Sequence, residues 1–445
     1  VAAASVVLPR NARRAVVSVA ATGQADEESW WSNVPEASKH TFDGTTLPGK
    51  GSFREVRLLI DGQVAGLSWP FPVVFTGGVS PALHRPIVGP QAFDLREHEV
   101  DVTPWLGLLC DGNPHQLAVE VVGADDAVVD RYWVLSGKVF VWLVDEMPGH
   151  VTVTNGSAPR VSLSKPDYVP RDTSVRGRHV RYDQTIHRRL EVRSTITTAS
   201  GQVDAAWTQT FAMRNQGLVL DSGNSQNLTG SYQGRDVATE NGTAVFDATY
   251  SYPILCSLAQ TMSDGNRSLT LRANLTQSLD LTLMGRAVFP NGLEAFLPFL
   301  DDKGSLAGAR VTTTKTGTGL FWQRDDGNKS GGFGSSSQHY VLASLDKAAG
   351  SESGHASDTP TYMAHDTGRP LYWRDIGVVN ETTTHDERWA YGLHMAATAP
   401  AVPGLDHQPN TFAAKFRAGR PGSASSPRQV AGGDVQRPGQ RPLSK

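Results

Sequence analysis

The sequence predicts an all-β protein built from two antiparallel units of β-sandwich or jelly-roll type, with few short helices. Apolar and polar residues alternate along several stretches, as they do in strands that bury one face. No long stretch shows the roughly 3.6-residue period of an amphipathic helix. Turn-forming residues separate the alternating stretches at the spacing typical of sandwiches and jelly rolls.

The first strands are predicted on either side of a tight turn. Asp61-Gly62 lies between the apolar stretches 56–60 and 63–66, and an aspartate-glycine pair is a strong signal for a two-residue hairpin. Asp111-Gly112 repeats this signal after the apolar residues 106–110, so a second turn after a strand is predicted there. We interpret both aspartates as turn residues. Further strands are predicted by the same alternation over 189–198, 206–213 and 269–276.

Length and composition predict more than one unit. The chain has 445 residues, which is more than one hydrophobic core usually serves. A segment rich in proline and glycine, 148–170, is the predicted boundary. We therefore expect a front unit over 1–157, a back β-sandwich unit over 158–414, and a disordered tail over 415–445, where apolar residues nearly disappear.

Charge and hydropathy exclude two classes of partner. The 41 basic and 44 acidic side chains give a formal charge of −3, which offers no field to attract nucleic acid. No apolar stretch reaches the roughly 20 residues that a membrane-spanning helix needs. We therefore expect a soluble protein that binds neither nucleic acid nor a membrane, and the oligomeric state stays open.

Asparagine acceptors for N-glycosylation are unusually frequent. They are Asn155, Asn227, Asn241, Asn266, Asn274, Asn328 and Asn380. Because such acceptors are used only in the secretory pathway, their number predicts a secreted or vacuolar protein. In that compartment the two cysteines, Cys110 and Cys256, could form a disulfide or could equally be buried thiols. The chain opens without a signal sequence, so we expect that a signal and a front segment precede it.

Several well-known catalytic motifs are missing from the sequence. It has no His-Glu-x-x-His, no closely spaced histidine pair and no Gly-x-Ser-x-Gly. Its glycine pairs lack the third glycine and the helix that phosphate-binding loops require. Neither cysteine follows the electropositive helix start that activates a thiolate. We therefore expect no metal, no cofactor and no cysteine nucleophile.

Carboxylates beside aromatic rings are the remaining candidates. Glu28 is followed by Trp30, Trp31 and Asn33, a combination that suits sugar recognition and acid/base catalysis. The simpler interpretation, which we weigh slightly above it, is that the tryptophans belong to the core and Glu28 is solvated. Glu55 falls on the strand face opposite Val56, so it could line a cleft, although a glutamate on a solvated sheet face is commoner.

A longer ordered pattern resembles the plant and fungal peptide N-glycosidase A family. The segments that carry the likeness are Pro9-Arg10-Asn11-Ala12, Glu28-Ser29-Trp30-Trp31-Ser32-Asn33, Gly51-Ser52-Phe53-Arg54-Glu55-Val56, Ile60-Asp61-Gly62, Pro70-Phe71-Pro72-Val73-Val74-Phe75-Thr76-Gly77-Gly78 and Thr103-Pro104-Trp105-Leu106-Gly107. The likeness implies hydrolysis of the amide that joins asparagine to the first N-acetylglucosamine of an N-linked glycan, in glycopeptides or denatured glycoproteins. It implies no metal or other cofactor.

That reaction needs a carboxylate to activate water, a donor for the oxyanion and an acid for the leaving nitrogen. Transferred onto the matching residues, the resemblance suggests Glu28 and Glu55 as the catalytic acid and base, in either order. Arg54 or backbone amides would face the oxyanion. Trp30 and Trp31 would stack on the sugars, and Asn33 would hydrogen-bond an acetamido group.

Other functions would suit the same composition. A lectin-like sandwich shares the strands and the tryptophans without needing an acid. An endo-acting glycosidase also uses paired carboxylates and aromatic platforms. A structural adhesion domain is less favoured because it does not account for the long motif.

Overall fold

A computed structural model describes residues 1–75, 78–83, 95–144, 153–198, 201–263, 265, 267–299, 308–324, 329–345, 369–380 and 382–391. Its strands form three antiparallel sheets. Two small sheets come from the first 143 residues, and a 12-stranded sheet comes from residues 155–390. We call the elements before residue 144 the front unit and the 12-stranded sheet the large sheet. The predicted tail, 415–445, lies outside the described residues.

The front unit contains one four-stranded sheet in the order β1-β6-β3-β4 and one three-stranded sheet in the order β5-β2-β7. Its strands are β1 (Ala2–Val6), β2 (Ala12–Gly23), β3 (Glu55–Ile60), β4 (Gln63–Ser68), β5 (His98–Asp101), β6 (His115–Val122) and β7 (Trp133–Leu143). Its helices are η1 (Ala25–Glu27), η2 (Trp30–Ser32), η3 (Glu36–Ser38), η4 (Thr103–Trp105), α2 (Leu106–Leu109) and η5 (Ala124–Asp126).

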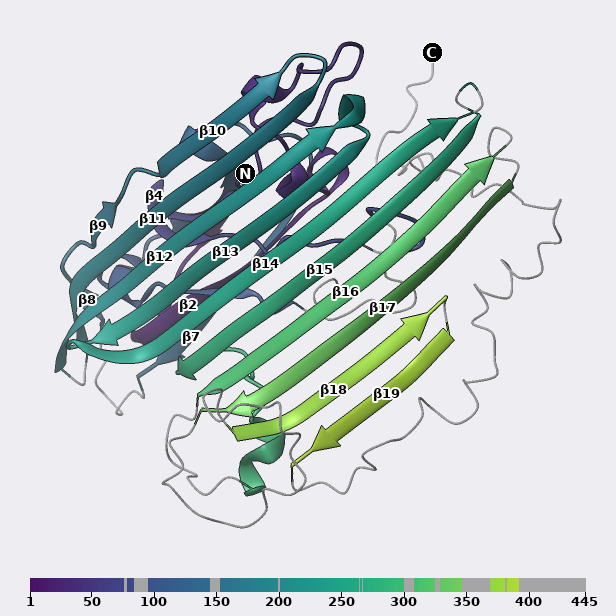
Figure 1. Ribbon diagram of the computed structural model, residues 1–445. Helices are drawn as coiled ribbons and strands as arrows, with labels where there is room; N and C mark the ends of the chain where they lie inside the picture. The colour runs from purple at the N-terminus through teal and green to yellow at the C-terminus, as the bar shows by residue number, and fades with distance from the viewer. Residues whose placement is uncertain are drawn as a thin grey trace, which may run out of the picture.

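The large sheet is a meander in which each long strand pairs with the next along the chain (Figure 1). Its strands are β8 (Asn155–Gly156), β9 (Arg160–Leu163), β10 (Asp167–Val175), β11 (His179–Thr198), β12 (Gly201–Leu220), β13 (Ser225–Glu240), β14 (Thr243–Ser263), β15 (Ser268–Gly285), β16 (Ala309–Arg324), β17 (Lys329–Ser344), β18 (Arg369–Val379) and β19 (Thr382–Ala390). Two short helices accompany it, η6 (Asp221–Gly223) and η7 (Glu294–Phe299).

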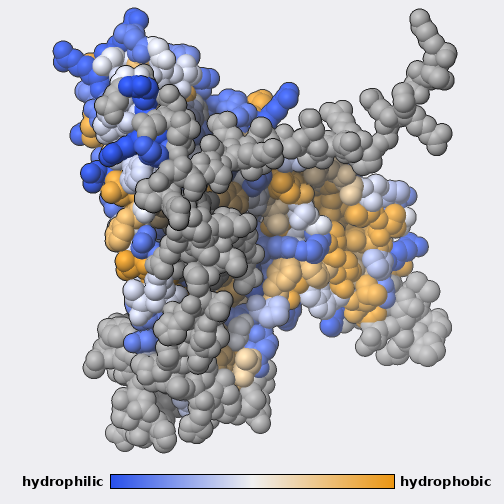
Figure 2. Space-filling view, turned by 90° about the vertical axis from the view of Figure 1, so that its right-hand side faces the viewer, coloured by the Kyte–Doolittle hydropathy of each residue, from blue (hydrophilic) through white to orange (hydrophobic). Residues whose placement is uncertain are grey.

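The front unit packs against one face of the large sheet. Figure 1 shows it behind β10 to β14, and Figure 2 shows the two layers from the side. Trp69 of the front unit stacks on Phe211 with ring centroids 4.9 Å apart, and Phe71 meets Tyr252 at 5.1 Å. One continuous core cluster includes buried residues of both layers. The layers therefore share a core, and side chains from distant parts of the chain meet at their interface.

The all-β prediction is confirmed, and so are the strands predicted over 189–198, 206–213 and 269–276, which lie inside β11, β12 and β15. The Asp61-Gly62 hairpin is also confirmed. Ile60 pairs with Gln63, and both turn residues have positive φ, 47° and 80°. The described strands after residue 154 lie in one sheet, and the layer that faces this sheet is the front unit.

The prediction of a strand before Asp111-Gly112 is wrong. Leu106–Leu109 form the short helix α2, and all of η4 just before it is buried. The reason is that an unbroken apolar run fits a buried helical turn as well as a buried strand. Asp111 does form a turn, because its carboxylate accepts a hydrogen bond from the backbone N–H of Asn113 at 2.7 Å. No helix among the described residues is long and apolar enough to cross a membrane.

Glycines of the large sheet let one front-unit segment lie directly on it. Ala82 and Leu83, in the segment 78–83, lie over β16 and β17, and a Cβ added at Gly334 would collide with the carbonyl oxygen of Ala82. At Gly319 an added Cβ would lie 3.1 Å from the side chain of Leu83. These glycines permit a close approach of two backbones.

Candidate functional site

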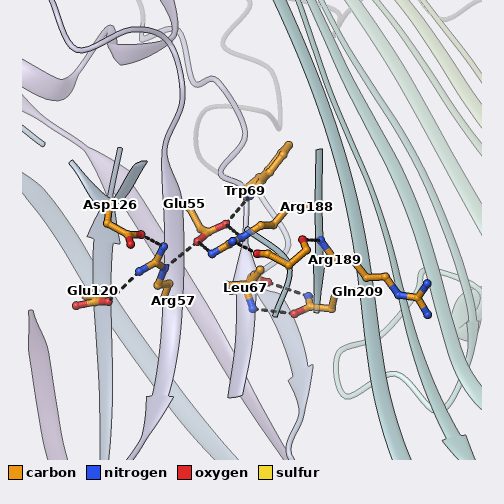
Figure 3. A network of polar contacts seen from close by, with 10 residues as sticks. Glu55, Arg57, Leu67, Trp69, Glu120, Asp126, Arg188, Arg189 and Gln209 are labelled. Carbon is orange, nitrogen blue, oxygen red and sulfur yellow. Dashed lines mark hydrogen bonds and ion pairs between the residues drawn. The ribbon is translucent and has the colours of Figure 1, made fainter. Parts of the chain in front are cut away.

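Glu55 is the centre of a polar network at the interface between the two layers (Figure 3). It begins β3, and its side chain is 1% exposed. One carboxylate oxygen accepts hydrogen bonds from Arg57 Nε at 2.8 Å and Arg188 Nη2 at 3.2 Å. The other accepts from Arg188 Nε at 3.1 Å and Trp69 Nε1 at 3.4 Å. Since Arg188 belongs to β11, Glu55 joins the front unit to the large sheet.

The network continues from Glu55 to the protein surface through Arg57. The Arg57 guanidinium also contacts Asp126, which is 69% exposed, and lies 3.8 Å from Glu120. Burial lowers the pKa of Arg57, but hydrogen bonds to Asp126 and Glu55 outweigh burial and raise it. Arg57 therefore stays charged and links a buried carboxylate to two carboxylates that water reaches.

Glu28 lies apart from this network. It follows η1 as its C-terminal cap and is partly exposed. Among the described residues its carboxylate has no hydrogen-bond or ion-pair partner, and no contact joins it to Glu55. The structure thus places one member of the predicted pair at a partly exposed position and the other in a buried network, and their catalytic roles stay predictions.

The neighbouring Glu27 is the buried acid of this segment. Its carboxylate pairs with Nε and Nη2 of Arg54 and accepts hydrogen bonds from Trp133 Nε1 and the backbone N–H of Asp130, each at 3.0 Å. Arg54 also donates to the carbonyl oxygens of Gly51 and Phe53. Each of the three guanidinium nitrogens of Arg54 thus has a partner, and its predicted role at an oxyanion stays a prediction.

The predicted sugar-binding residues are packed inside the protein. Trp30 and Trp31 are each 2% exposed and Asn33 is 3% exposed. Trp30 meets Tyr232 of β13 edge-on at 5.5 Å, and Trp31 Nε1 donates to the carbonyl oxygen of Val73 at 3.1 Å. In this conformation neither indole offers a face to solvent. The structure gives both rings a packing role, and sugar stacking stays a prediction.

Sequence reasoning missed Glu27 and Arg188. Nothing local separates Glu27 from the acids on either side of it, because the distinction depends on Arg54 and Trp133. A signal for Arg188 is present in the sequence. It lies between Ile186 and Leu190 on the apolar side of an alternating strand, and a buried arginine needs a carboxylate partner.

Cys110 and Cys256 are free thiols, so the structure does not form the disulfide that the sequence allowed. Burial raises the pKa of Cys110 to about 11 and that of Cys256 to about 12, which makes both unreactive as thiolates. Among the described residues, no group of three or more His, Cys, Asp or Glu side chains could hold a metal ion.

Five of the glycosylation acceptors lie among the described residues, and all five are exposed: Asn155, Asn227, Asn241, Asn274 and Asn380. The other two, Asn266 and Asn328, lie outside those residues. Asn227 and Asn274 face a shallow hollow of about 630 Å³ on the outer side of the large sheet, opposite the front unit.

Two family models match this chain. Residues 1–157 match the family described as peptide N-acetyl-beta-D-glucosaminyl asparaginase amidase A, and residues 181–254 match its C-terminal domain. The chain is similar to the peptide-N4-(N-acetyl-beta-glucosaminyl)asparagine amidase A of Prunus dulcis, with 31% identity over 221 residues. The match covers 49% of this chain and 37% of that relative, so the chain spans well under half of the relative's length. No solved structure matches the fold. Because it matches both the N-terminal and the C-terminal domain of this family, the chain belongs to the peptide N-glycosidase A family.

Proposed function

We propose that this protein hydrolyses the amide bond between asparagine and the first N-acetylglucosamine of N-linked glycopeptides. The observation that carries the proposal is the match of residues 1–157 to the amidase family, because it covers the whole front unit. The products are an aspartyl peptide and a glycosylamine. The packing of the front unit on the large sheet supports a site that uses residues of both.

Glu28 and Glu55 are the proposed acidic residues. Glu28 is the one that solvent reaches, so it suits direct contact with water or with the leaving nitrogen. Glu55 is held by Arg57, Arg188 and Trp69, so proton transfer by Glu55 requires the displacement of one of these donors.

Replacing each glutamate by glutamine tests these roles. Glu28→Gln and Glu55→Gln each remove a titrating group at constant size, and a catalytic role predicts that turnover of a glycopeptide falls about a hundredfold or more. Turnover is to be divided by the folded fraction, measured by circular dichroism. Near-native turnover of a folded variant would remove that residue from the catalytic pair.

Product masses test the proposed reaction. After incubation with a defined N-glycopeptide, an amidase leaves a peptide in which asparagine has become aspartate, a gain of about one mass unit. A lectin leaves the glycopeptide intact. An endo-acting glycosidase leaves N-acetylglucosamine on asparagine. Either of these results would overturn the proposal.

We also propose that the protein enters the secretory pathway, supported by the exposure of the described acceptors. Asn241 suits modification because it lies at a turn, with φ of 50°. Peptide mapping of the secreted protein should find a glycan there. Bare asparagine at every acceptor would contradict this proposal.

A further inference from the structure

A second polar cluster lies at the interface between the layers. His98 of β5 belongs to the front unit, and Asp236 of β13 belongs to the large sheet. The imidazole Nε2 lies 3.0 Å from a carboxylate oxygen of Asp236. The angle between the two groups does not meet the geometry of a hydrogen bond, so the contact is a close approach of two ionisable groups. The Asp236 side chain is 3% exposed. The two residues come from segments matched by the two different family models.

Gln209 fixes the position of the Asp236 carboxylate. Its side-chain nitrogen donates to the other oxygen of Asp236 at 2.8 Å and to the carbonyl oxygen of Leu67 at 2.8 Å. Its side-chain oxygen accepts from the backbone N–H of Leu67 at 2.7 Å. Because Leu67 is in β4, this amide joins Asp236 to the front unit as well.

Asp236 differs from the other buried carboxylates at this interface. Glu27 and Glu55 are each paired with arginine, whereas Asp236 has no lysine or arginine partner among the described residues. The basic group that Asp236 contacts is the His98 imidazole. A buried carboxylate that holds one nitrogen of a histidine orients the ring and stabilises its protonated form, which is how aspartate acts in known acid/base pairs.

His98 keeps one side open to solvent. Nε2 is fully buried, so the exposed part of the side chain, 13%, lies on its other atoms. Tyr250 meets the imidazole edge-on, with ring centroids 5.5 Å apart and planes at 90°, and limits its rotation. Burial, together with the nearby Asp236, raises the pKa of Tyr250 well above its usual range, so the phenol stays neutral.

The other ionisable groups of this strand have partners elsewhere. In β5, Glu99 contacts Arg96 and the backbone N–H groups of residues 288 and 289, and Asp101 contacts Arg14. Glu97, just before the strand, contacts Lys138 and Ser18. From the large sheet, Tyr250 and Asp236 face His98, and Tyr252 stacks on Tyr250 at 5.3 Å.

We propose that His98 is a proton-transfer residue of the amidase reaction and that Asp236 positions it. This inference rests on the proposed function, but it gives His98 the two proton transfers for which Glu28 and Glu55 are the other candidates. A folded His98→Gln variant that loses turnover, beside Glu28→Gln and Glu55→Gln variants that keep it, favours His98. Neutral His98 takes a proton from water as the water oxygen bonds to the amide carbon. The imidazolium then gives this proton to the amide nitrogen as the C–N bond breaks. Peptide aspartic acid and a glycosylamine result, and His98 returns to its neutral form, ready for the next water.

The test compares His98→Gln and Asp236→Asn with the matched control His115→Gln. His115 also contacts aspartates, Asp61 and Asp111, but it lies at the outer turns of the front unit. For His98→Gln we expect kcat on a glycopeptide to fall about a hundredfold, with KM changed by no more than a few fold. Its pH–rate profile should lose the limb that reports the imidazole. Asp236→Asn should lower kcat less and move that limb, while His115→Gln should leave both unchanged.

The outcomes separate this inference from the proposed function. Wild-type protein that releases no aspartyl peptide would overturn the proposed function. Active wild type together with a folded His98→Gln variant of unchanged kcat and pH profile would overturn the role of His98 alone. If His98→Gln does not fold, nuclear magnetic resonance of ¹⁵N-histidine in the wild type supplies the readout. A glycopeptide should perturb the His98 signal and leave the His115 signal in place, and an unperturbed His98 signal would overturn the role.

Discussion

Glu55, a buried carboxylate at the interface, is held by an arginine that is distant in sequence. Glu55 and Arg188 are separated by 133 positions in the sequence. Both side chains are nevertheless buried, and two hydrogen bonds join them. Removing one partner of a buried pair leaves an uncompensated charge, which is costly in a medium that solvates it poorly.

Arg188→Met should therefore lower the free energy of unfolding by about 3 kcal/mol, because Glu55 loses two hydrogen bonds and one of its two arginine partners. Arg189→Met is the matched control. The Arg189 side chain is 62% exposed on the opposite face of β11, so we expect a change within about 0.5 kcal/mol. Urea unfolding measures both. Equal effects of the two substitutions would show that the buried pair does not stabilise the interface.

His115 makes stability depend on pH at the turns of the front unit. Burial lowers the pKa of His115, but Asp61 and Asp111 outweigh burial and raise it. The pKa of Asp111 falls to about 2, chiefly through the backbone and side chain of Asn113, and the His115 hydrogen bond lowers that of Asp61. The imidazolium contributes stability that is lost as pH rises through its raised pKa. The carboxylates contribute stability that is lost as pH falls through their lowered pKa values.

The Tm difference between wild type and His115→Gln should therefore be largest between about pH 4 and 6.5, the range between the ordinary pKa values of aspartate and histidine. It should shrink as the pH moves above or below that range. Thermal melting across pH measures it. A Tm difference that does not vary with pH would contradict the assigned ion pairs.

At the scale of elements, the contact between residues 78–83 and the large sheet depends on glycine. Gly334→Ala should destabilise the protein by about 1–3 kcal/mol, because the new methyl group would meet the Ala82 carbonyl and lie 2.9 Å from the carbonyl oxygen of Thr318. Ser335→Ala, next along β17, alters a side chain that contacts Thr318 and serves as the control. Urea midpoints compare the two, and a neutral Gly334→Ala would show that the segment does not lie there.

Strand alternation predicts most elements but underestimates their length. The strand predicted over 189–198 is the end of β11, which begins at His179. The earlier part was missed because Gln184 and Arg188 occupy buried positions where the pattern predicts apolar residues. Both are satisfied by the front unit, Gln184 by Ser52 and Arg188 by Glu55. A polar residue on a buried face is accepted when a distant segment supplies its partner, and local alternation does not contain that information.

At the scale of the whole molecule, the same limit applies to the site. The family-like segments that contain Glu28 and Glu55 are visible in the sequence. What each residue contacts depends on how the front unit lies on the large sheet, because Arg188, Asp236 and Gln209 all come from that sheet. The pairing of His98 with Asp236 joins positions 138 residues apart and has no local signature.

Our central proposal is that the protein hydrolyses the amide bond of N-linked glycopeptides. The reaction takes place where the front unit packs against the large sheet. The most direct measurement is hydrolysis of a defined glycopeptide in water enriched in ¹⁸O, followed by mass analysis of both products. Our account predicts one ¹⁸O in the side chain of the new aspartate and none in the glycosylamine as it is released. Label in the sugar, with asparagine still carrying N-acetylglucosamine, would contradict it.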